Sequence, residues 1–274
     1  IRVCPLKSIQ RSNNIGSNVI SETLKNGLHT TVVGSRFIYH KRLSSTMDEA
    51  IREINKGTVE GTVLLTDEQT AGRGRFERQW FSGPGDLMFS VVFYPSYKEL
   101  PYLSVLAALA VVRTIEKETD LLPRIKWPND ILVNGKKICG LLVENLTKGN
   151  SSGHSIVGIG LNVGMNVKSY PEISDIATSI NTESKMDTSL VSLFQGIIQQ
   201  LDNLYLAVKD GYSPIGEWKQ YLYALGQTVE IRINDEIVSG LAEGVDELGH
   251  LLVRTSDDKI VTIMAGEATF NPMA

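Results

Sequence analysis

The sequence has little cysteine and histidine. Cys4 and Cys139 are its two cysteines, too few for a disulfide scaffold and in keeping with a reducing compartment. Cys139 lies in an apolar stretch, which favours a core residue over a nucleophile. The four histidines are scattered without the spacing of metal ligands, so we expect no resident metal site.

Excess charge of one sign and long hydrophobic runs are also missing. A net charge of −4 argues against a protein that coats nucleic acid, although a local basic loop is compatible with it. The longest uncharged apolar run, Leu100 to Val112, has 13 residues, whereas a membrane-spanning helix needs about 20. We therefore expect no membrane span and a cytoplasmic protein, or an organellar one if a targeting segment before Ile1 was removed.

What is present is the patterning of a mixed α/β protein followed by a small β domain. Residues 1–35 are weakly patterned and polar, and are interpreted as an N-terminal extension or linker, with order beginning at Arg36. Residues 36–225 mix strands and helices, and residues 226–274 carry short apolar runs at roughly ten-residue spacing. Strands are expected over 37–39, 62–66, 87–94, 125–127, 131–133, 137–144 and 155–163, and helices over 46–56, 101–119, 188–209 and 214–224.

Two local signals sharpen this reading. Thr46 and Glu49 are three residues apart at a helix start and suggest a capping box. Asn134-Gly135 between two apolar runs predicts a type I′ hairpin turn.

The stretch from Gln69 to Trp80 follows a strand and contains two glycines, three arginines and an aromatic residue. Glycines let the backbone approach a ligand, and arginines bind phosphate or carboxylate oxygens through a planar fork. This composition suits a nucleotide or acyl-phosphate ligand, but it also fits a solvated basic loop or an RNA contact. No P-loop with Gly-Lys-Ser/Thr occurs.

A second motif, Lys126 to Asp130, turns sharply out of a strand and is followed by Lys137 after the hairpin. Lys137 could neutralise a carboxylate and a phosphate together. The plainer alternatives are a surface lysine and a turn-capping aspartate.

Two shorter features are less specific. Gly158 and Gly160 inside a strand, followed by Asn162, indicate close backbone approach, either by a ligand or through packing. Ser45 and Thr46 at a helix N-terminus could bind a polar group or only cap the helix.

These motifs occur in one order, and in that order the sequence resembles the catalytic domain of biotin protein ligases, also called holocarboxylase synthetases. The resemblance covers about residues 36–225, and the β segment behind it resembles the family's small C-terminal domain. It implies an α/β catalytic domain with a mixed sheet like that of class II aminoacyl-tRNA synthetases, followed by an SH3-like β-barrel.

The family's reaction has two steps. Biotin and MgATP give biotinyl-5′-AMP and pyrophosphate, and biotin then passes to one lysine of the biotin carboxyl carrier domain of a biotin-dependent carboxylase. The implied small molecules are thus biotin, ATP and Mg²⁺. Residues 1–35 are too short and polar for the helix-turn-helix of bifunctional members, so we expect no DNA binding. The resemblance leaves open whether the protein forms a homodimer.

The resemblance also implies roles for individual residues. In catalysis it implies Lys137, Arg75 and Asp130. In biotin binding it implies Ser45, Thr46, Gln69, Gly72, Arg73, Gly74, Arg75, Lys137, Gly140, Gly158 and Gly160. In ATP binding it implies Arg73, Arg75, Arg78, Trp80, Asn129, Lys137 and Asn162.

Two rival interpretations remain. Lipoate–protein ligases and octanoyltransferases share the fold but lack the Gly-Arg-Gly-Arg…Trp loop. A non-catalytic RNA-binding module would use the arginine loop, but it leaves Lys137 and the Lys-Trp-Pro-Asn-Asp turn unexplained, and the pI of about 5.7 disfavours it.

Overall fold

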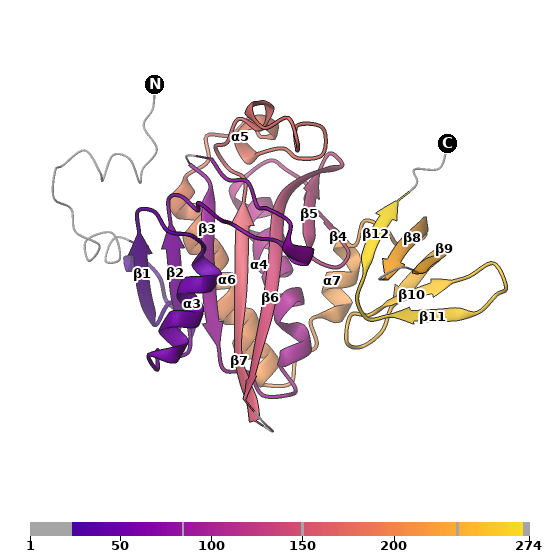
Figure 1. The fold of residues 1–274 in the computed structure, drawn as a ribbon, viewed down its shortest axis with the longest axis horizontal. Coiled ribbons are helices and arrows are strands. Elements are labelled where there is room, and N and C mark those ends of the chain that lie inside the picture. Colours follow the sequence, from indigo (N-terminus) through magenta and orange to yellow (C-terminus); the bar gives the residue numbers. More distant parts are fainter. Residues whose placement is uncertain (1–23, 84, 149–150, 234–235, 271–274) are drawn as a thin grey trace.

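A seven-stranded sheet forms the centre of the computed structural model, which describes residues 24–83, 85–148, 151–233 and 236–270 (Figure 1). The strand order is β1-β2-β3-β7-β6-β5-β4, with β1 and β2 parallel and the other neighbours antiparallel. The strands are β1 (Arg36–His40), β2 (Thr62–Thr66), β3 (Leu87–Phe93), β4 (Arg124–Lys126), β5 (Asp130–Val133), β6 (Lys136–Lys148) and β7 (Ser151–Leu161).

Helices cover both faces of this sheet, which explains why β2 and β3 are apolar without alternation. Phe89 and Phe93 of β3 face the main core with the long helices α4 and α6, whereas Val92 faces a smaller cluster with α3. Figure 1 shows α3 on the opposite side of the sheet from α4 and α6. The helices are α3 (Thr46–Asn55), α4 (Leu103–Glu118), α5 (Ile180–Glu183), α6 (Leu190–Lys209) and α7 (Ile215–Tyr221), with 3₁₀ turns η1 (Arg75–Glu77), η2 (Leu100–Tyr102) and η3 (Val167–Ser169).

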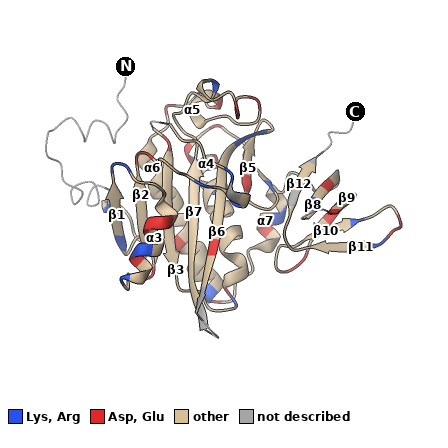
Figure 2. Cartoon of the chain, viewed as in Figure 1, with Lys and Arg blue, Asp and Glu red and all other residues tan. Residues whose placement is uncertain are grey.

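The helix predicted from the longest apolar run is α4, and it is buried on nearly all sides, from Leu103 to Ile115. A helix that is hydrophobic all round belongs inside a core. No helix within the described residues is long and apolar enough to cross a membrane. Figure 2 shows charges of both signs spread over the molecule, while β3 and β7 carry none.

The cap of α3 differs from the expected capping box. Ser45 is the N-cap, and its Oγ accepts a hydrogen bond from Met47 N at 3.2 Å. The Thr46 hydroxyl instead contacts side chains of the neighbouring elements, and Glu49 pairs with Arg52 on its own helix. The tertiary partners of Thr46 therefore decide which hydroxyl caps the helix.

Order begins before Arg36, contrary to expectation. Residues 24–33 lie against α6, where Asp202 accepts hydrogen bonds from the backbone N–H groups of residues 31–33, each at 2.8 Å. Gln199 and Gln195, one and two turns earlier on α6, bind the backbone of residues 24–29. Leu24 and Val33 are buried in the main core. The remainder of the predicted extension, residues 1–23, lies outside the described residues.

A five-stranded antiparallel sheet follows α7, in the order β11-β10-β9-β8-β12. On β8 the buried residues Val229 and Ile231 alternate with exposed ones, as expected for a sheet with one wet face. Trp127 Nε1 donates to Gly249 O at 3.1 Å and so joins the two sheets. The strands are β8 (Thr228–Ile233), β9 (Glu236–Val245), β10 (Leu251–Arg254), β11 (Ile260–Ile263) and β12 (Glu267–Phe270).

Candidate active site

A cavity of about 590 Å³ opens on the face of the large sheet that carries α3. The residues from Gln69 to Phe81, including η1, form one wall, and Figure 1 shows this segment crossing in front of β6. The floor comes from β6 and β7, and the turn between β4 and β5 closes one side. Ala268 and Thr269 of the small sheet also reach the cavity.

The end of the cavity at α3 holds a tightly connected polar group. Gln69 Oε1 accepts hydrogen bonds from Thr46 N at 2.8 Å and from Thr46 Oγ1 at 3.2 Å. Ser90 Oγ lies 2.7 Å from Thr46 Oγ1 and donates to it. Apolar side chains such as Met47 and Leu142 line the cavity beside this group. This end therefore suits a ligand with a small polar head on an apolar body.

Alternate residues of β7 run along the floor. Gly158 and Gly160 of β7 and Asn162, the residue that follows the strand, are spaced two residues apart, so they lie along one face over about 13 Å. A Cβ on Gly160 would lie 2.5 Å from Trp80 Cε2, and one on Gly140, its partner across β6, would lie 2.8 Å from Trp80 Cζ3. The two glycines thus make room for the Trp80 ring.

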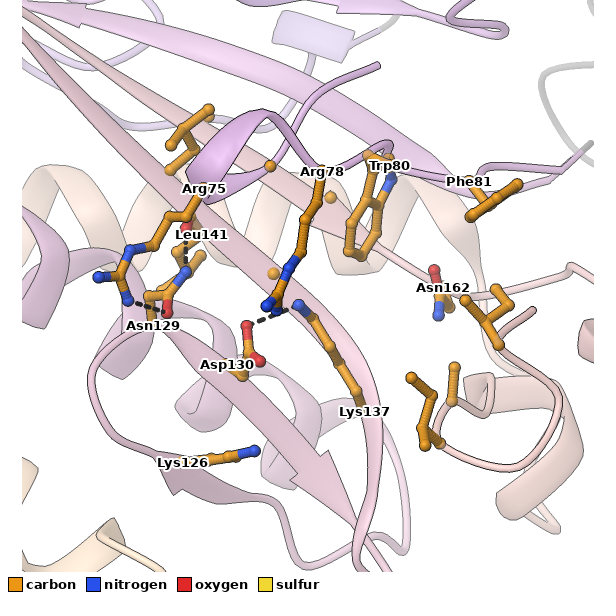
Figure 3. A pocket seen from close by; sticks show the side chains of 18 of the residues that line it. Arg75, Arg78, Trp80, Phe81, Lys126, Asn129, Asp130, Lys137, Leu141 and Asn162 are labelled. Atoms are coloured by element: carbon orange, nitrogen blue, oxygen red, sulfur yellow. Dashed lines mark hydrogen bonds and ion pairs between the residues drawn. The ribbon is translucent and has the colours of Figure 1, made fainter. Parts of the chain in front are cut away.

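Lys137 and Asp130 form an ion pair in the middle of the cavity (Figure 3), with Lys137 Nζ 2.7 Å from Asp130 Oδ1. Lys137 Nζ also lies 5.3 Å from the centre of the Trp80 ring, within range of a cation–π contact. Backbone bonds from Lys137 to Ile176 and Thr178 hold the start of β6. An ammonium group is therefore fixed where the two ends of the cavity meet.

Arg75 connects the arginine-rich loop to both sheets. Its guanidinium donates to Asn129 Oδ1 at 3.1 Å and to Gly266 O, next to β12, at 3.0 Å. Asn129 is itself fixed, because its Nδ2 donates to Leu141 O at 2.7 Å. Figure 3 shows Arg75 and Arg78 extending from this loop toward the Asn129–Asp130 turn.

Arg73 points to a different set of partners. Its Nη2 lies 2.9 Å from Asp48 Oδ1 on α3 and 3.3 Å from Glu144 Oε2 on β6. Two carboxylates on separate elements thus hold the N-terminal part of the loop. This geometry favours an anchor for Arg73 over a direct ligand contact.

Asn162 lies at the opposite end of the cavity from Thr46 and is 3% exposed. Its Nδ2 donates to Thr178 O at 3.0 Å, whereas its Oδ1 is buried with no hydrogen-bond partner. A buried acceptor without a donor is unfavourable unless a ligand supplies one. Asn162 therefore marks the place where a ligand N–H group would fit.

The structure brings together every predicted site residue except Gly72. Gly72 is buried behind the loop, and its carbonyl accepts the N–H of Trp80 at 2.9 Å. The predicted residues that line the cavity are Ser45, Thr46, Gln69, Arg73, Gly74, Arg75, Arg78, Trp80, Asn129, Asp130, Lys137, Gly140, Gly158, Gly160 and Asn162. Cys139, predicted to be a core residue, is buried, and burial raises the pKa of its thiol well above its usual range.

Sequence reasoning missed two groups of lining residues. Ile173 to Ala177 form a wall because Ala177 pairs with Lys137, a contact that no local motif reveals. Gln227 and Thr269 line the cavity because the small sheet packs beside it. Lys126, by contrast, stands within a motif that was recognised but was not assigned a role.

The charges of the cavity suit anions. Five cationic side chains line the cavity, compared with two carboxylates. The cations are Arg73, Arg75, Arg78, Lys126 and Lys137, and the carboxylates are Asp130 and Asp175. Preorganised cations of this kind stabilise negative charge that develops in a transition state. Within the described ranges, no three His, Cys, Asp or Glu side chains form a group that could hold a metal ion.

Two family models match the chain. Residues 39–162 match the biotin/lipoate A/B protein ligase family. Residues 224–270 match the biotin protein ligase C-terminal domain.

Individual relatives agree with the family models. The bifunctional ligase/repressor BirA of Bacillus subtilis is 37% identical over 237 residues, which cover 84% of this chain and 73% of the relative. A biotin–[acetyl-CoA-carboxylase] ligase of Paracoccus denitrificans is 29% identical over 78% of this chain and 92% of its own. The structure of a biotin protein ligase from Aquifex aeolicus in complex with biotin and ATP superposes with a TM-score of 0.74, at 28% identity, over 87% of this chain and 100% of that one.

Proposed function

Because this chain belongs to the biotin protein ligase family and is a biotin–protein ligase, we propose that it makes biotinyl-5′-AMP from biotin and ATP and then transfers biotin to a carrier lysine. The carrier would be the biotin carboxyl carrier domain of a biotin-dependent carboxylase, in keeping with the name of the Paracoccus relative. The observation that carries the proposal is Lys137, an ammonium fixed between the Thr46 end and the Asn162 end of one cavity.

In the first step, a carboxylate oxygen of biotin attacks the α-phosphorus of ATP. A new O–P bond forms, and the bond to pyrophosphate breaks. Both reacting groups are anionic, so bringing them together is electrostatically unfavourable without a cation between them. Lys137 would leave Asp130 and bind both groups, and Arg75 and Arg78 would reach the phosphates. The protein then acts by positioning and charge stabilisation.

Biotin fits the end of the cavity at α3. Its ureido ring would meet the hydroxyl of Thr46 and the amide of Gln69, with Ser45 alongside. Its sulfur ring and aliphatic chain would lie on Met47, Leu142 and the floor at Gly158. The carboxylate at the end of that chain would then come near Lys137.

The nucleotide fits the other end. The exocyclic amine of adenine would supply the donor that Asn162 Oδ1 lacks. Trp80, held on Gly140 and Gly160, would offer an aromatic face. Asn129 would help to place Arg75 on the phosphates. Mg²⁺ would enter together with ATP.

In the second step, the amine of the carrier lysine attacks the acyl carbon of biotinyl-AMP. An amide bond forms and AMP leaves. The position of Asp130 beside Lys137 is compatible with orienting the nucleotide, its metal ion or the incoming amine.

Biotin-dependent exchange of labelled pyrophosphate into ATP tests the proposal, because only reversible adenylate formation returns the label. We expect exchange with biotin and none with lipoate. Exchange that needs lipoate and ignores biotin would overturn the proposal. Transfer to a purified carrier domain, followed by mass spectrometry of the modified lysine, tests the second step.

A further inference from the structure

Asp86, just before β3, gathers an unusual number of backbone hydrogen bonds. Its Oδ1 accepts from the N–H groups of Val163, Gly164 and Met165 at 2.8, 3.0 and 3.1 Å. Its Oδ2 accepts from Gly83 N at 2.7 Å. The residue is 4% exposed. One carboxylate therefore ties the end of the arginine-rich loop to the turn after β7.

The hydrogen-bond donors to the Asp86 carboxylate are all peptide N–H groups. Burial raises the pKa of Asp86, and the bonds from Gly83 and the Val163–Met165 turn oppose that rise. A carboxylate offers acceptor sites on both oxygens, whereas an asparagine amide has one oxygen and one NH₂ group. In Asp86→Asn, the single amide oxygen can accept hydrogen bonds either from Gly83 or from the Val163–Met165 turn. The NH₂ group would then face the N–H groups of the other segment.

The segments that Asp86 joins both end at the cavity. Val163 directly follows Asn162, so the bond to Val163 N fixes the backbone beside the orphan acceptor. Gly83 follows Trp80 and Phe81, and Phe81 packs against Tyr170 of the loop beyond the turn. Asn162 also has hydrogen bonds of its own to Ile138, Ile180 and Thr178, so loss of the Asp86 bonds would shift its oxygen away from the ligand rather than release the residue.

We propose that Asp86 is a positioning residue for recognition of the nucleotide base. By clamping the Val163–Met165 turn, it keeps Asn162 Oδ1 aimed at the exocyclic amine of adenine. This inference rests on the proposed function. Asp86 does not line the cavity, so it acts through Asn162.

The test compares ATP with purine riboside triphosphate, which lacks the exocyclic amine, in biotin-dependent pyrophosphate exchange. In the unaltered protein we expect kcat/KM to favour ATP by about tenfold, the value of one well-placed hydrogen bond. Asp86→Asn should raise the KM for ATP about tenfold and reduce this preference to about twofold or less, while the KM for biotin changes by less than about twofold.

Asp202→Asn is the matched control. Asp202 is also a buried carboxylate that holds consecutive backbone N–H groups, but it lies on α6 and does not line the cavity. This variant should lower the melting temperature and leave the preference for ATP unchanged. Equal loss of preference in both variants would show that Asp86 has only a general structural role, and would overturn the proposal.

A double-mutant cycle keeps the proposal testable if Asp86→Asn folds poorly. Asp86→Glu keeps the charge but adds a methylene group, and should also weaken the preference for ATP. In an Asn162→Ala background, neither substitution should reduce that preference further, because its source is already gone. Additive losses would overturn the proposal. Absence of a base preference in the unaltered protein would overturn it too, whereas absence of any biotin-dependent exchange would instead refute the proposed function.

Discussion

In the large sheet, β2 and β3 are buried along their whole length, whereas β8 of the small sheet buries every second residue. The large sheet has helices on both faces and carries Lys137, Asp130 and Asn162. The small sheet adds the edge of the cavity through Ala268 and Thr269 and the carbonyl that binds Arg75. The strands covered on both faces hold the reacting side chains in place. The small sheet provides a carbonyl group, Gly266 O, to which Arg75 of the loop can bind.

The largest change in the free energy of unfolding should come from removing a large side chain from the sheet that is covered by helices on both faces. Phe93 is fully buried, and its ring centre lies 4.7 Å from that of Tyr205 on α6. Phe93→Ala should lower the free energy of unfolding by about 4 kcal/mol, measured by urea titration. Ile231→Val in the small sheet should lower it by about 1 kcal/mol. A loss from Phe93→Ala no larger than that from Ile231→Val would contradict the tight packing of β3 between its two helix layers.

Lys137→Ala should reduce pyrophosphate exchange by about 10²- to 10³-fold, as expected for loss of a preorganised charged group. Without the ammonium, Asp130 would repel both anionic substrates. Lys136→Ala, on the exposed neighbouring lysine of the same strand, is the control and should retain activity. Both variants should unfold at the same urea concentration as the parent. An active Lys137→Ala protein would show that another cation holds the two anions.

Arg75→Gly should let biotinyl-AMP escape, because it removes the bonds from the loop to Asn129 and to Gly266. We expect release of the adenylate to be about tenfold faster, as for loss of a charge-assisted hydrogen bond. The escaped adenylate should label bystander proteins such as albumin, visible on a streptavidin blot. Arg42→Gly, which removes an exposed arginine paired with Glu68, should not.

Limited proteolysis of the parent protein tests whether the glycine-containing loop is mobile without ligand. Protease digestion of the parent should be slower with biotinyl-AMP than without it. A loop that resists protease equally in both states, or an Arg75→Gly protein that labels only its carrier, would contradict this explanation.

The smallest effect should come from α7, the helix that leads into the small sheet. Hydrogen bonds from the Arg113 guanidinium lower the pKa of Glu217, so the ionised carboxylate stabilises the fold above its unfolded pKa of 4.5. That contribution, about 1 kcal/mol for a half-buried pair, is lost as the pH falls through the lowered pKa. Once the pH is below the lowered pKa of Glu217, the urea midpoints of Glu217→Gln and the parent should therefore converge. A constant difference at all pH values would assign the stability to packing.

Much of the fold follows from local pattern. The strand at Thr62–Thr66 and the buried helix α4 appear where the apolar residues place them. Asn134 and Gly135 have φ values of 51° and 76°, as a type I′ turn requires. The attachment of residues 24–33 was not predicted, because α6 holds them mainly through their backbone groups and only a few of their side chains, such as Leu24 and Val33, are buried.

The site was recognisable as a set of motifs, but its internal contacts were not. Gly160 did indicate close approach, and in this structure the group that approaches it is Trp80, which also lies over Gly140. The ion pairs of Arg73 with Asp48 and Glu144 join elements that are distant in sequence. Asp86 matched no motif, because its role depends on a turn almost eighty residues further along the chain.

The paired glycines under Trp80 also limit how the substrate range can evolve. Any amino-acid substitution at either glycine adds atoms, and the first added carbon would lie within 2.8 Å of the indole ring. A substitution at either glycine can displace the Trp80 ring and reduce the volume of the cavity, but it cannot increase that volume. A protein of this fold that accepts a bulkier acid must therefore differ at the tryptophan or in the surrounding loops.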